Sequence, residues 1–136
     1  MKITRRAEFS ASHFCANPKL TPEENHRIYG EAANLHGHGH NYTVEVTLDG
    51  DPDSVTGMVM DLKVLKEIID QEVIEPMDHR FLNHEVKPFD SVVPTTENLA
   101  REIWSRLRPR FENQKARLDS IRVFETEDLW VEYSER

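Results

Sequence analysis

The sequence predicts an α+β fold in which four antiparallel strands form one sheet with two helices on one face, in the order ββααββ. Three observations predict it. Apolar and polar residues alternate with a period of two near both ends of the chain, and two stretches of helical spacing lie between them. No helix separates the strands within either pair, which favours antiparallel neighbours. The length of 136 residues predicts one domain, residues 1–136.

The first predicted strand covers residues 2–15, and its apolar parity ends in a histidine. The positions of that parity are Ile3, Ala7, Phe9, Ala11 and His13. Residues 17–30 follow as an insertion that holds a short helix. Thr21 is its expected N-cap, Pro22 takes the first helical position, and Glu24 completes a capping box.

The second predicted strand begins at the end of a histidine-rich stretch, "HGHGHNYTVEV", and again has a period of two. One face carries His38, His40, Tyr42, Val44, Val46 and Leu48. The cluster "DGDPDSVTG", residues 49–57, is typical of a turn and ends this strand.

Two helices are expected in the middle of the chain. Asp61 caps the first, which is predicted from Leu62 to about Ile74 and is ended by Pro76. Thr95 caps the second, which is predicted to run to about Arg108 before Pro109 stops it.

Two strands complete the predicted sheet. Ile121, Val123 and Glu125 share one face of the first, and Leu129, Val131 and Tyr133 share one face of the second. A four-stranded open sheet has two free edges, and the sequence shows no feature that blocks them. We therefore expect edge pairing between subunits.

Composition limits the classes of partner. The net charge of -8 argues against a nucleic-acid or membrane surface, because phosphate-rich partners need a basic face. No apolar run has the length of a membrane span, and the first residues lack the apolar core of a signal peptide. The single cysteine, Cys15, cannot form an internal disulfide and is compatible with a cytoplasmic location.

Three histidines predict a metal site. His38 and His40 point to the same side of a strand, so both can reach one ion, and His13 ends the neighbouring strand on its apolar parity. Three imidazoles with one open position are typical of catalytic zinc. An isolated His-x-His pair also fits solvated polar positions. His36 has the same parity but lies further into the loop, and we expect it not to be a ligand.

Two further groups offer acid–base and binding chemistry. Asp78 and His79 are adjacent in a loop after a helix and a proline, where a carboxylate can tune an imidazole for proton transfer. A surface ion pair would give the same pattern. Thr96 and Glu97 begin the second helix, where capping explains them and a ligand contact is also compatible.

Glu125 is a carboxylate on an apolar parity, and such a group needs a partner. A ligand with two adjacent N–H donors, such as the amidine edge of a guanine or pterin ring, would satisfy it in bidentate fashion. A salt bridge to Arg122 or Arg117 is the alternative.

Six motifs occur in one order across residues 7–133: "FSASH", "GHGHNY", "GMVMDLKVLK", "MDHRFLNH", "PTTENLA" and "FETEDLWVEY". Together they resemble the 6-pyruvoyltetrahydropterin synthase / 6-carboxytetrahydropterin synthase family. The resemblance implies the tunnelling fold, in which three subunits join their sheets into a barrel and two trimers form a homohexamer. It also implies active sites between subunits.

The resemblance assigns roles to residues at matching positions. His13, His38 and His40 match the ligands of a Zn²⁺ ion, and Asp78 and His79 match a catalytic pair that an adjacent subunit supplies.

Three further positions match the part of the site that holds the pterin. Glu125 matches the glutamate that anchors the pterin ring, and Thr96 with Glu97 matches the segment that lines its pocket. The implied substrate is the small molecule 7,8-dihydroneopterin triphosphate. The implied reaction is that of a lyase forming a 6-pyruvoyl- or 6-carboxy-tetrahydropterin, in tetrahydrobiopterin, deazaguanine (queuosine) or folate synthesis.

One position departs from the family. Ala32 stands where the resemblance implies the proton-abstracting cysteine, and an alanine cannot take a proton. The chain is then an engineered Cys→Ala variant, or Cys15 supplies the thiol, or Glu31 is the base of a paralogue that cleaves dihydroneopterin triphosphate to 6-hydroxymethyl-dihydropterin. A catalytically silent pterin-binding hexamer is a further alternative.

Overall fold

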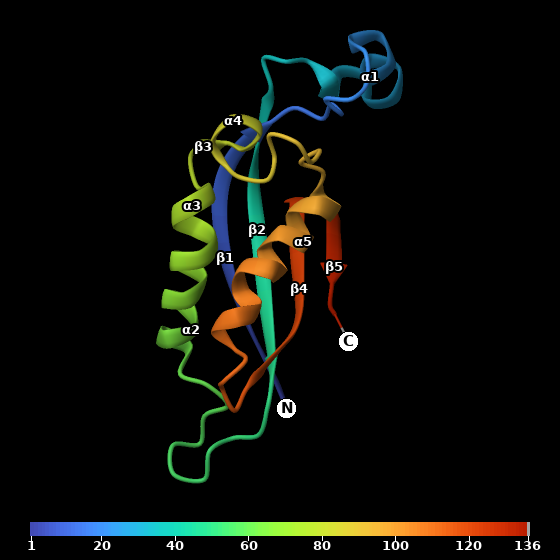
Figure 1. The fold of residues 1–136 in the computed structure, drawn as a ribbon. Coiled ribbons are helices and arrows are strands. Elements are labelled where there is room, and N and C mark those ends of the chain that lie inside the picture. The colour runs from blue at the N-terminus through green and yellow to red at the C-terminus, as the bar shows by residue number, and fades with distance from the viewer. Residues whose placement is uncertain (136) are drawn as a thin grey trace.

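The computed structural model describes residues 1–135 and contains one five-stranded sheet with strand order β3-β1-β2-β4-β5. Arg136, the last residue of the predicted domain, lies outside the described residues. The strands are β1 (Lys2–His13), β2 (His38–Asp49), β3 (Arg80–Phe81), β4 (Arg117–Thr126) and β5 (Leu129–Tyr133). The four long strands pair antiparallel with one another, as predicted, in the order β1-β2-β4-β5 (Figure 1).

The helices lie between β2 and β4, except for those in the insertion. The insertion contains α1 (Pro22–Tyr29), and a 3-10 helix, Gly30–Ala33, follows it directly. The others are α2 (Leu62–Ile69), a π-helical turn (Asp70–Ile74), α3 (Glu75–Met77), α4 (Leu82–Glu85), α5 (Thr96–Leu107) and a 3-10 turn (Arg108–Arg110). Thr21 and Glu24 form the predicted capping box of α1, and Thr95 caps α5 as predicted.

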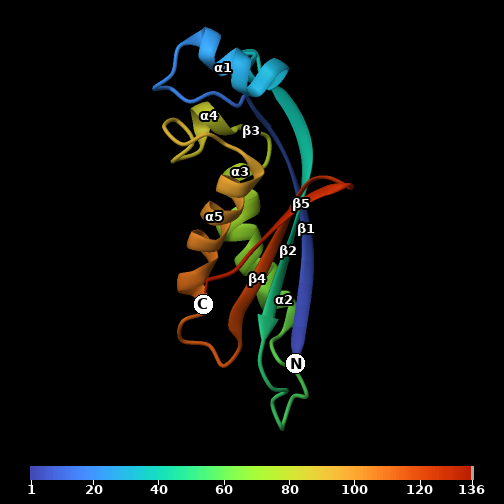
Figure 2. The same ribbon diagram turned by 90° about the vertical axis from the view of Figure 1, so that its right-hand side faces the viewer.

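The helices cover one face of the sheet and the core lies beneath them. Figure 2 shows α5 and α3 on one side of the β1–β2 ribbon, with α1 beyond the upper end of the sheet. The covered face carries the apolar parity predicted for β2, from Tyr42 to Leu48, which is buried. Leu65 and Ile69 of α2 and Leu99 and Ile103 of α5 are also buried in this core. Burial of these apolar side chains supplies most of the driving force for the fold.

The prediction of four strands was wrong by one. The fifth, β3, has two residues and pairs in parallel with the outer edge of β1, through Ala11↔Arg80 and Ser12↔Phe81. A two-residue strand is too short to show a period in sequence. It covers only the end of the β1 edge, so the rest of that edge stays open for the predicted pairing between subunits.

The first long helix does not end at Pro76. It continues through a π-helical turn and ends after Met77, so Pro76 lies inside its last turn. The Asp78 N–H donates to the Ile74 carbonyl at 2.7 Å across this end. A π-turn, Asp70–Ile74, widens the helix just before Pro76, which has no N–H to donate within the last turn.

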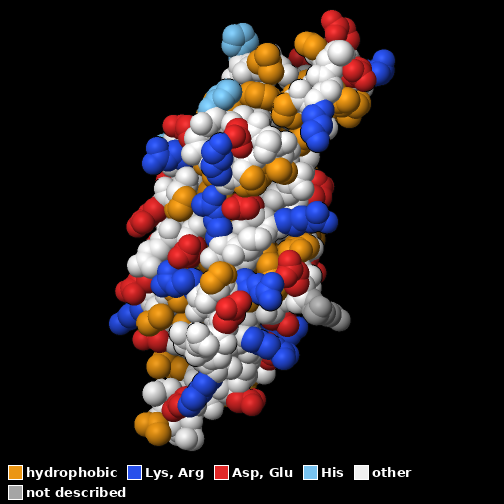
Figure 3. Space-filling view, in the orientation of Figure 1, with side chains coloured by type: hydrophobic (Ala, Val, Ile, Leu, Met, Phe, Trp, Pro, Cys, Tyr) orange, Lys and Arg blue, Asp and Glu red, His pale blue; other side chains and the backbone are white. Residues whose placement is uncertain are grey.

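The face of the sheet without helices is polar, which explains how it stays exposed. Its side chains form cross-strand ion pairs, among them Arg6–Glu45, Lys2–Asp119 and Arg117–Asp49. On the helical side, acidic and basic side chains are interspersed over the body of the molecule (Figure 3). Within residues 1–135 we find no helix that is both long and apolar enough to cross a membrane.

Candidate metal centre

Three histidines meet on the covered face at the upper end of the β1–β2 pair. His13 is the last residue of β1 and lies opposite His38, while His40 lies opposite Ala11. Because residues two apart in a strand share a face, the parity that buries Tyr42 also turns His38 and His40 toward the core side. The predicted convergence of these three histidines is therefore confirmed at the level of geometry.

The imidazole nitrogens have the spacing of ligands around one ion. One nitrogen from each histidine lies within 4.8 Å of the other two, and the Nε2 atoms of His13 and His38 are 3.1 Å apart. Two nitrogens at about 2.0–2.1 Å from a tetrahedral metal are about 3.3 Å apart. The cluster thus fits a metal with little adjustment.

The ring of His13 is oriented from behind by a backbone group. Its Nδ1 lies 2.8 Å from the Pro94 carbonyl oxygen, which can only accept, so Nδ1 carries the proton and Nε2 is left as a lone-pair donor. Such a hydrogen bond is the usual way in which a metal-binding histidine is held. His13 is 1% exposed, and burial lowers the pKa of its imidazole, which favours the neutral form that binds metals.

His40 supplies the second sign of a ligand site. Its Nε2 is buried and has no hydrogen-bond partner among the described residues. Glu125 Oε1 lies 3.0 Å away but is not aligned for a hydrogen bond. Burial lowers the pKa of His40, and Glu125 opposes this effect without reversing it. A buried nitrogen without a partner is costly, and a metal ion would satisfy it.

Glu125 faces the histidines from β4 and is held by α5. The hydroxyl of Thr96 donates to its Oε2 at 2.5 Å. The arginines considered as alternative partners pair elsewhere, Arg122 with Glu132 and Arg117 with Asp49. The Glu125 carboxylate is therefore available on the side of the histidines. Glu97 lies one residue beyond Thr96 in the first turn of α5, where it is exposed.

Cys15 lies near the same carboxylates. Burial, followed by the charges of Glu125 and Glu97, raises the pKa of its thiol to about 11. A thiol with such a pKa is protonated near neutral pH and is a poor base. This speaks against Cys15 as the proton acceptor.

Position 32 is tied to the end of β1. The Cys15 N–H donates to the Ala32 carbonyl at 2.7 Å, so Ala32 is bonded to a residue two positions after His13. A cavity beside the 3-10 helix is lined by Gly30, Glu31 and Ala33 but not by Ala32. Because successive residues of a 3-10 helix point about 120° apart, Glu31 and Ala32 face different sides.

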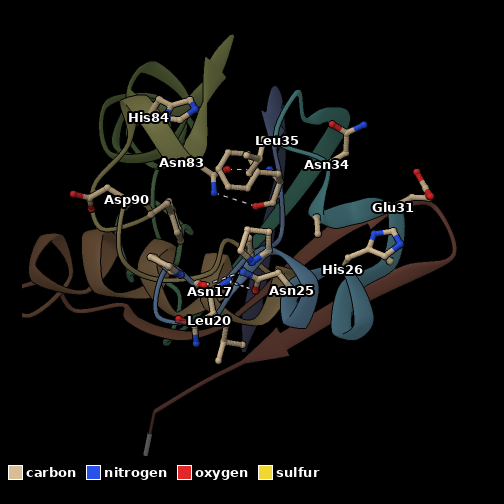
Figure 4. A pocket seen from close by; sticks show the side chains of 17 residues that line it. Asn17, Leu20, Asn25, His26, Glu31, Asn34, Leu35, Asn83, His84 and Asp90 are labelled. Carbon is tan, nitrogen blue, oxygen red and sulfur yellow. Dashed lines mark hydrogen bonds between the residues drawn. The ribbon is translucent and has the colours of Figure 1, made fainter.

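The cavity has a volume of about 630 Å³ and lies between α1, the 3-10 helix and the loop around α4. Phe14, Leu20, Leu35 and Phe89 supply apolar walls. Glu31 is exposed at its rim, with the carboxylate pointing outward (Figure 4). The side chain of the candidate base Glu31 therefore lies at this cavity, whereas Ala32 does not line it.

Asp78 and His79 lie at the outer edge of β1. The Ser10 N–H donates to the Asp78 carboxylate at 2.9 Å, and this bond is the main cause that lowers the pKa of Asp78. The backbone N–H of His79 donates to the Ser10 carbonyl at 2.6 Å. The Nδ1 atom of the His79 ring is 3.0 Å from the Asp78 carboxylate. The His79 side chain is 83% exposed, and its φ of 59° is unusual for a residue other than glycine.

The structure thus pairs Asp78 with His79 but does not bring them to the metal centre of the same chain. Within residues 1–135, their hydrogen bonds go to the β1 edge, to the end of the preceding helix and to each other. An exposed pair at a sheet edge is well placed to reach a neighbouring molecule.

Gly37 shapes the loop that leads to His38. Its φ is +76°, and a Cβ at this position would lie 2.8 Å from the ring of Phe81. Phe81 belongs to β3, so the strand missed by sequence reasoning also packs against the entry to the metal centre. His36 precedes Gly37, is exposed and lies outside the cluster of His13, His38 and His40.

Sequence reasoning also missed Pro94. It acts through its backbone carbonyl, for which no residue type is a signal. The nearest indication in the sequence is that Pro94 directly precedes Thr95, the predicted N-cap of α5.

Comparisons with known proteins agree with this geometry. The profile of the family described as 6-pyruvoyl tetrahydropterin synthase matches residues 2–136. The chain is 41% identical to the human 6-pyruvoyl tetrahydrobiopterin synthase, over 97% of this chain and 90% of the relative. It is 30% identical to the 6-carboxy-5,6,7,8-tetrahydropterin synthase of Rickettsia bellii, over 97% of this chain and 99% of the relative.

The fold agrees as well. The structure of the 6-pyruvoyl tetrahydropterin synthase of Caenorhabditis elegans superposes with a TM-score of 0.93, at 34% identity, over 100% of this chain and 96% of that one. The subunit fold implied by the resemblance is confirmed in this way. From the profile, the relatives and the structure together, the chain belongs to the 6-pyruvoyl tetrahydropterin synthase family.

Proposed function

We propose that the chain is a zinc-dependent lyase of the pterin synthase type that acts on 7,8-dihydroneopterin triphosphate, with altered activity because of Ala32. The observation that carries the proposal is the histidine cluster of His13, His38 and His40 with the Glu125 carboxylate beside it. Family membership supports the reaction class.

The donor set favours zinc. Three neutral imidazoles are a common protein ligand set of catalytic zinc, which keeps a fourth position open. The lowered pKa of His13 and of His40 keeps both rings in the neutral form that the metal requires. When bound, zinc would polarise hydroxyl groups of the substrate side chain and make neighbouring protons more acidic.

Glu125 is suited to hold the pterin ring. Its carboxylate is fixed by the Thr96 hydroxyl and can accept two N–H donors from the amidine edge of the ring. Thr96 and Glu97 then line the same pocket from the start of α5. Because Glu125 Oε1 is 3.0 Å from His40 Nε2, a pterin ring held by Glu125 would lie next to the metal position.

Asp78 and His79 complete the site from a neighbouring subunit. Their exposed position at the β1 edge supports this arrangement, because that edge is free to pair over most of its length. A homohexamer made of two trimers would close the sheet edges and bring the pair to a partner's metal centre.

Zinc-loaded protein incubated with dihydroneopterin triphosphate tests the proposal. We expect slow release of triphosphate, or slow cleavage of the side chain, which a chelator stops. Product analysis by mass spectrometry distinguishes 6-pyruvoyl- and 6-carboxy-tetrahydropterin from 6-hydroxymethyl-dihydropterin. The last product, together with loss of activity in Glu31→Gln, would assign the chain to the paralogue that uses Glu31. No product from either the parent or Ala32→Cys would indicate a silent pterin-binding protein.

Replacing Glu125 by glutamine should weaken pterin binding. The amide accepts one N–H where the carboxylate accepts two, and a hydrogen bond to a charged group contributes about 1.5–3 kcal/mol. We expect affinity for 7,8-dihydroneopterin to fall about 10- to 100-fold in calorimetry. Glu127→Gln, an exposed neighbour in the β4–β5 turn, is the matched control and should bind like the parent. Equal affinity of Glu125→Gln and the parent would contradict this role.

A further inference from the structure

Two buried asparagines hold the segment that follows His13. Among residues 1–135, the buried polar and charged side chains are those of His13, Asn25, Asn83 and Thr96. His13 and Thr96 belong to the candidate site. Asn25 is 8% exposed and Asn83 is 7% exposed, and the candidate site uses neither. A buried amide costs free energy unless it is hydrogen-bonded, so its hydrogen-bond partners indicate which part of the structure it stabilises.

Asn83 reaches from α4 to the residue directly after His13. Its Oδ1 accepts from the Phe14 N–H at 2.9 Å, and its Nδ2 donates to the Phe14 carbonyl at 3.0 Å. The amide thus occupies both backbone groups of one residue, as a neighbouring strand would. Phe14 lies just beyond the end of β1, where the sheet no longer fixes the backbone. Asn83 therefore extends the constraint past His13.

Asn25 repeats the arrangement from α1. Its Oδ1 accepts from the Asn17 N–H at 2.8 Å, and its Nδ2 donates to the Asn17 carbonyl at 3.0 Å. Figure 4 shows both asparagines with their bonds to this segment. Helix α1 runs directly into the 3-10 helix that contains Ala32. The bonds from Asn25 to Asn17 therefore also limit where the 3-10 helix, and with it residue 32, can lie relative to the segment after His13.

The bond between Cys15 and Ala32 lies between these two contacts. The Cys15 N–H donates to the Ala32 carbonyl at 2.7 Å, between Phe14, which Asn83 holds, and Asn17, which Asn25 holds. A leucine of similar size would fill either asparagine position without burying a polar group. An amide adds a defined geometry, since it binds only one alignment of the backbone.

We propose that Asn83 and Asn25 are positioning residues with separate roles. Asn83 fixes His13 for the metal, and Asn25 fixes position 32 against the segment that follows His13. The kinetic role of position 32 rests on the proposed reaction. The effect on metal binding rests on the histidine cluster alone, and the effect on backbone exchange rests on neither.

Asn83→Leu and Asn25→Leu, which keep the volume and remove the amide, test the proposal. Cobalt affinity is measured by competition with a chromophoric chelator, and hydrogen exchange is followed in peptides that cover residues 14–17 and 30–34. For Asn83→Leu we expect cobalt affinity to fall about tenfold, at the lower end of the effects of residues behind metal ligands. For Asn25→Leu we expect unchanged cobalt affinity with faster exchange in both peptides.

Kinetics adds an independent measurement. In the Ala32→Cys background, Asn25→Leu should lower kcat about tenfold and leave KM unchanged, because misplacement of a reacting group costs rate rather than binding. Ile103→Val, a core change in α5, is the control for general destabilisation and should alter neither cobalt affinity nor exchange in these peptides.

Three results would overturn the proposal. One is parent-like cobalt affinity in Asn83→Leu. The second is an equal loss of cobalt affinity in both variants, which would indicate general loosening. The third is parent-like exchange of both peptides in Asn25→Leu. If Ala32→Cys proves inactive, the proposed function fails, while the cobalt and exchange measurements still decide the roles of the asparagines.

Discussion

His13→Ala should abolish high-affinity zinc binding. The substitution removes the nitrogen that lies 3.1 Å from His38 Nε2, and two histidines cannot hold the ion as three do. We expect the zinc affinity measured by chelator competition to fall by at least about 10²-fold, more than removal of a residue behind a ligand costs. Turnover should fall with it. The effect is among the largest we expect, since the change removes a ligand rather than a residue that orients one.

His36→Ala is the matched control. His36 belongs to the same histidine run and is exposed outside the cluster, so its removal should leave zinc affinity unchanged. His13 is buried, and its replacement also leaves the Pro94 carbonyl without its donor, so folding is checked by circular dichroism. His38→Ala, at a less buried ligand, gives the same test with less risk to the core. Strong zinc binding by both ligand variants would contradict the metal centre.

Ala32→Cys should raise turnover of dihydroneopterin triphosphate by about 10²- to 10⁴-fold, the usual contribution of a positioned proton acceptor. The Cys15 N–H already holds the backbone carbonyl of position 32, so we expect the loop to keep its position when the thiol is introduced. Zinc affinity should remain that of the parent, because residue 32 is outside the histidine cluster. The rate is measured as triphosphate release with excess zinc and a reductant that keeps the introduced thiol from forming a disulfide with Cys15.

Ala33→Cys separates the effect of position from that of an added thiol. Ala33 lines the cavity beside Glu31, whereas Ala32 does not, so a thiol at position 33 should give no gain. Equal gains from both variants would show that the thiol acts without being positioned. No gain from Ala32→Cys would show that the site has lost more than its proton acceptor.

Much of the fold follows from sequence because its long elements have clear periods. The two 12-residue strands β1 and β2 alternate over their whole length, and their register aligns His13 with His38. The caps at Thr21 and Thr95 are local signals, and both were predicted correctly. Local chemistry and long periods are what a single sequence records best.

Features without a period or a side-chain signal were missed. Strand β3 has two residues and depends on the return of the chain to the edge of β1. Pro76 was expected to end a helix that in fact continues, after a π-turn, to Met77. The Pro94 carbonyl orients His13 through backbone alone. The strand β3 and the Pro94 contact depend on parts of the chain that are distant in sequence, and a single sequence does not display such contacts locally.

The candidate site divides in the same way. Strand parity predicted that His13, His38 and His40 converge, and the same argument placed Glu125 on their side. Parity gave no prediction for Glu31 and Ala32, because the turn that contains them is a 3-10 helix and not a strand. Strand parity did not place Asp78 and His79, which are held at the edge of β1 through Ser10. Only the family resemblance implied that the pair acts from an adjacent subunit.

Anomalous diffraction at the zinc edge, from crystals grown with zinc and 7,8-dihydroneopterin, tests the central claim most directly. The account predicts one peak per chain at about 2.0–2.1 Å from one nitrogen each of His13, His38 and His40. It also predicts the pterin ring with its amidine edge on Glu125. A chain without a peak at these histidines, or a pterin bound away from Glu125, would contradict it.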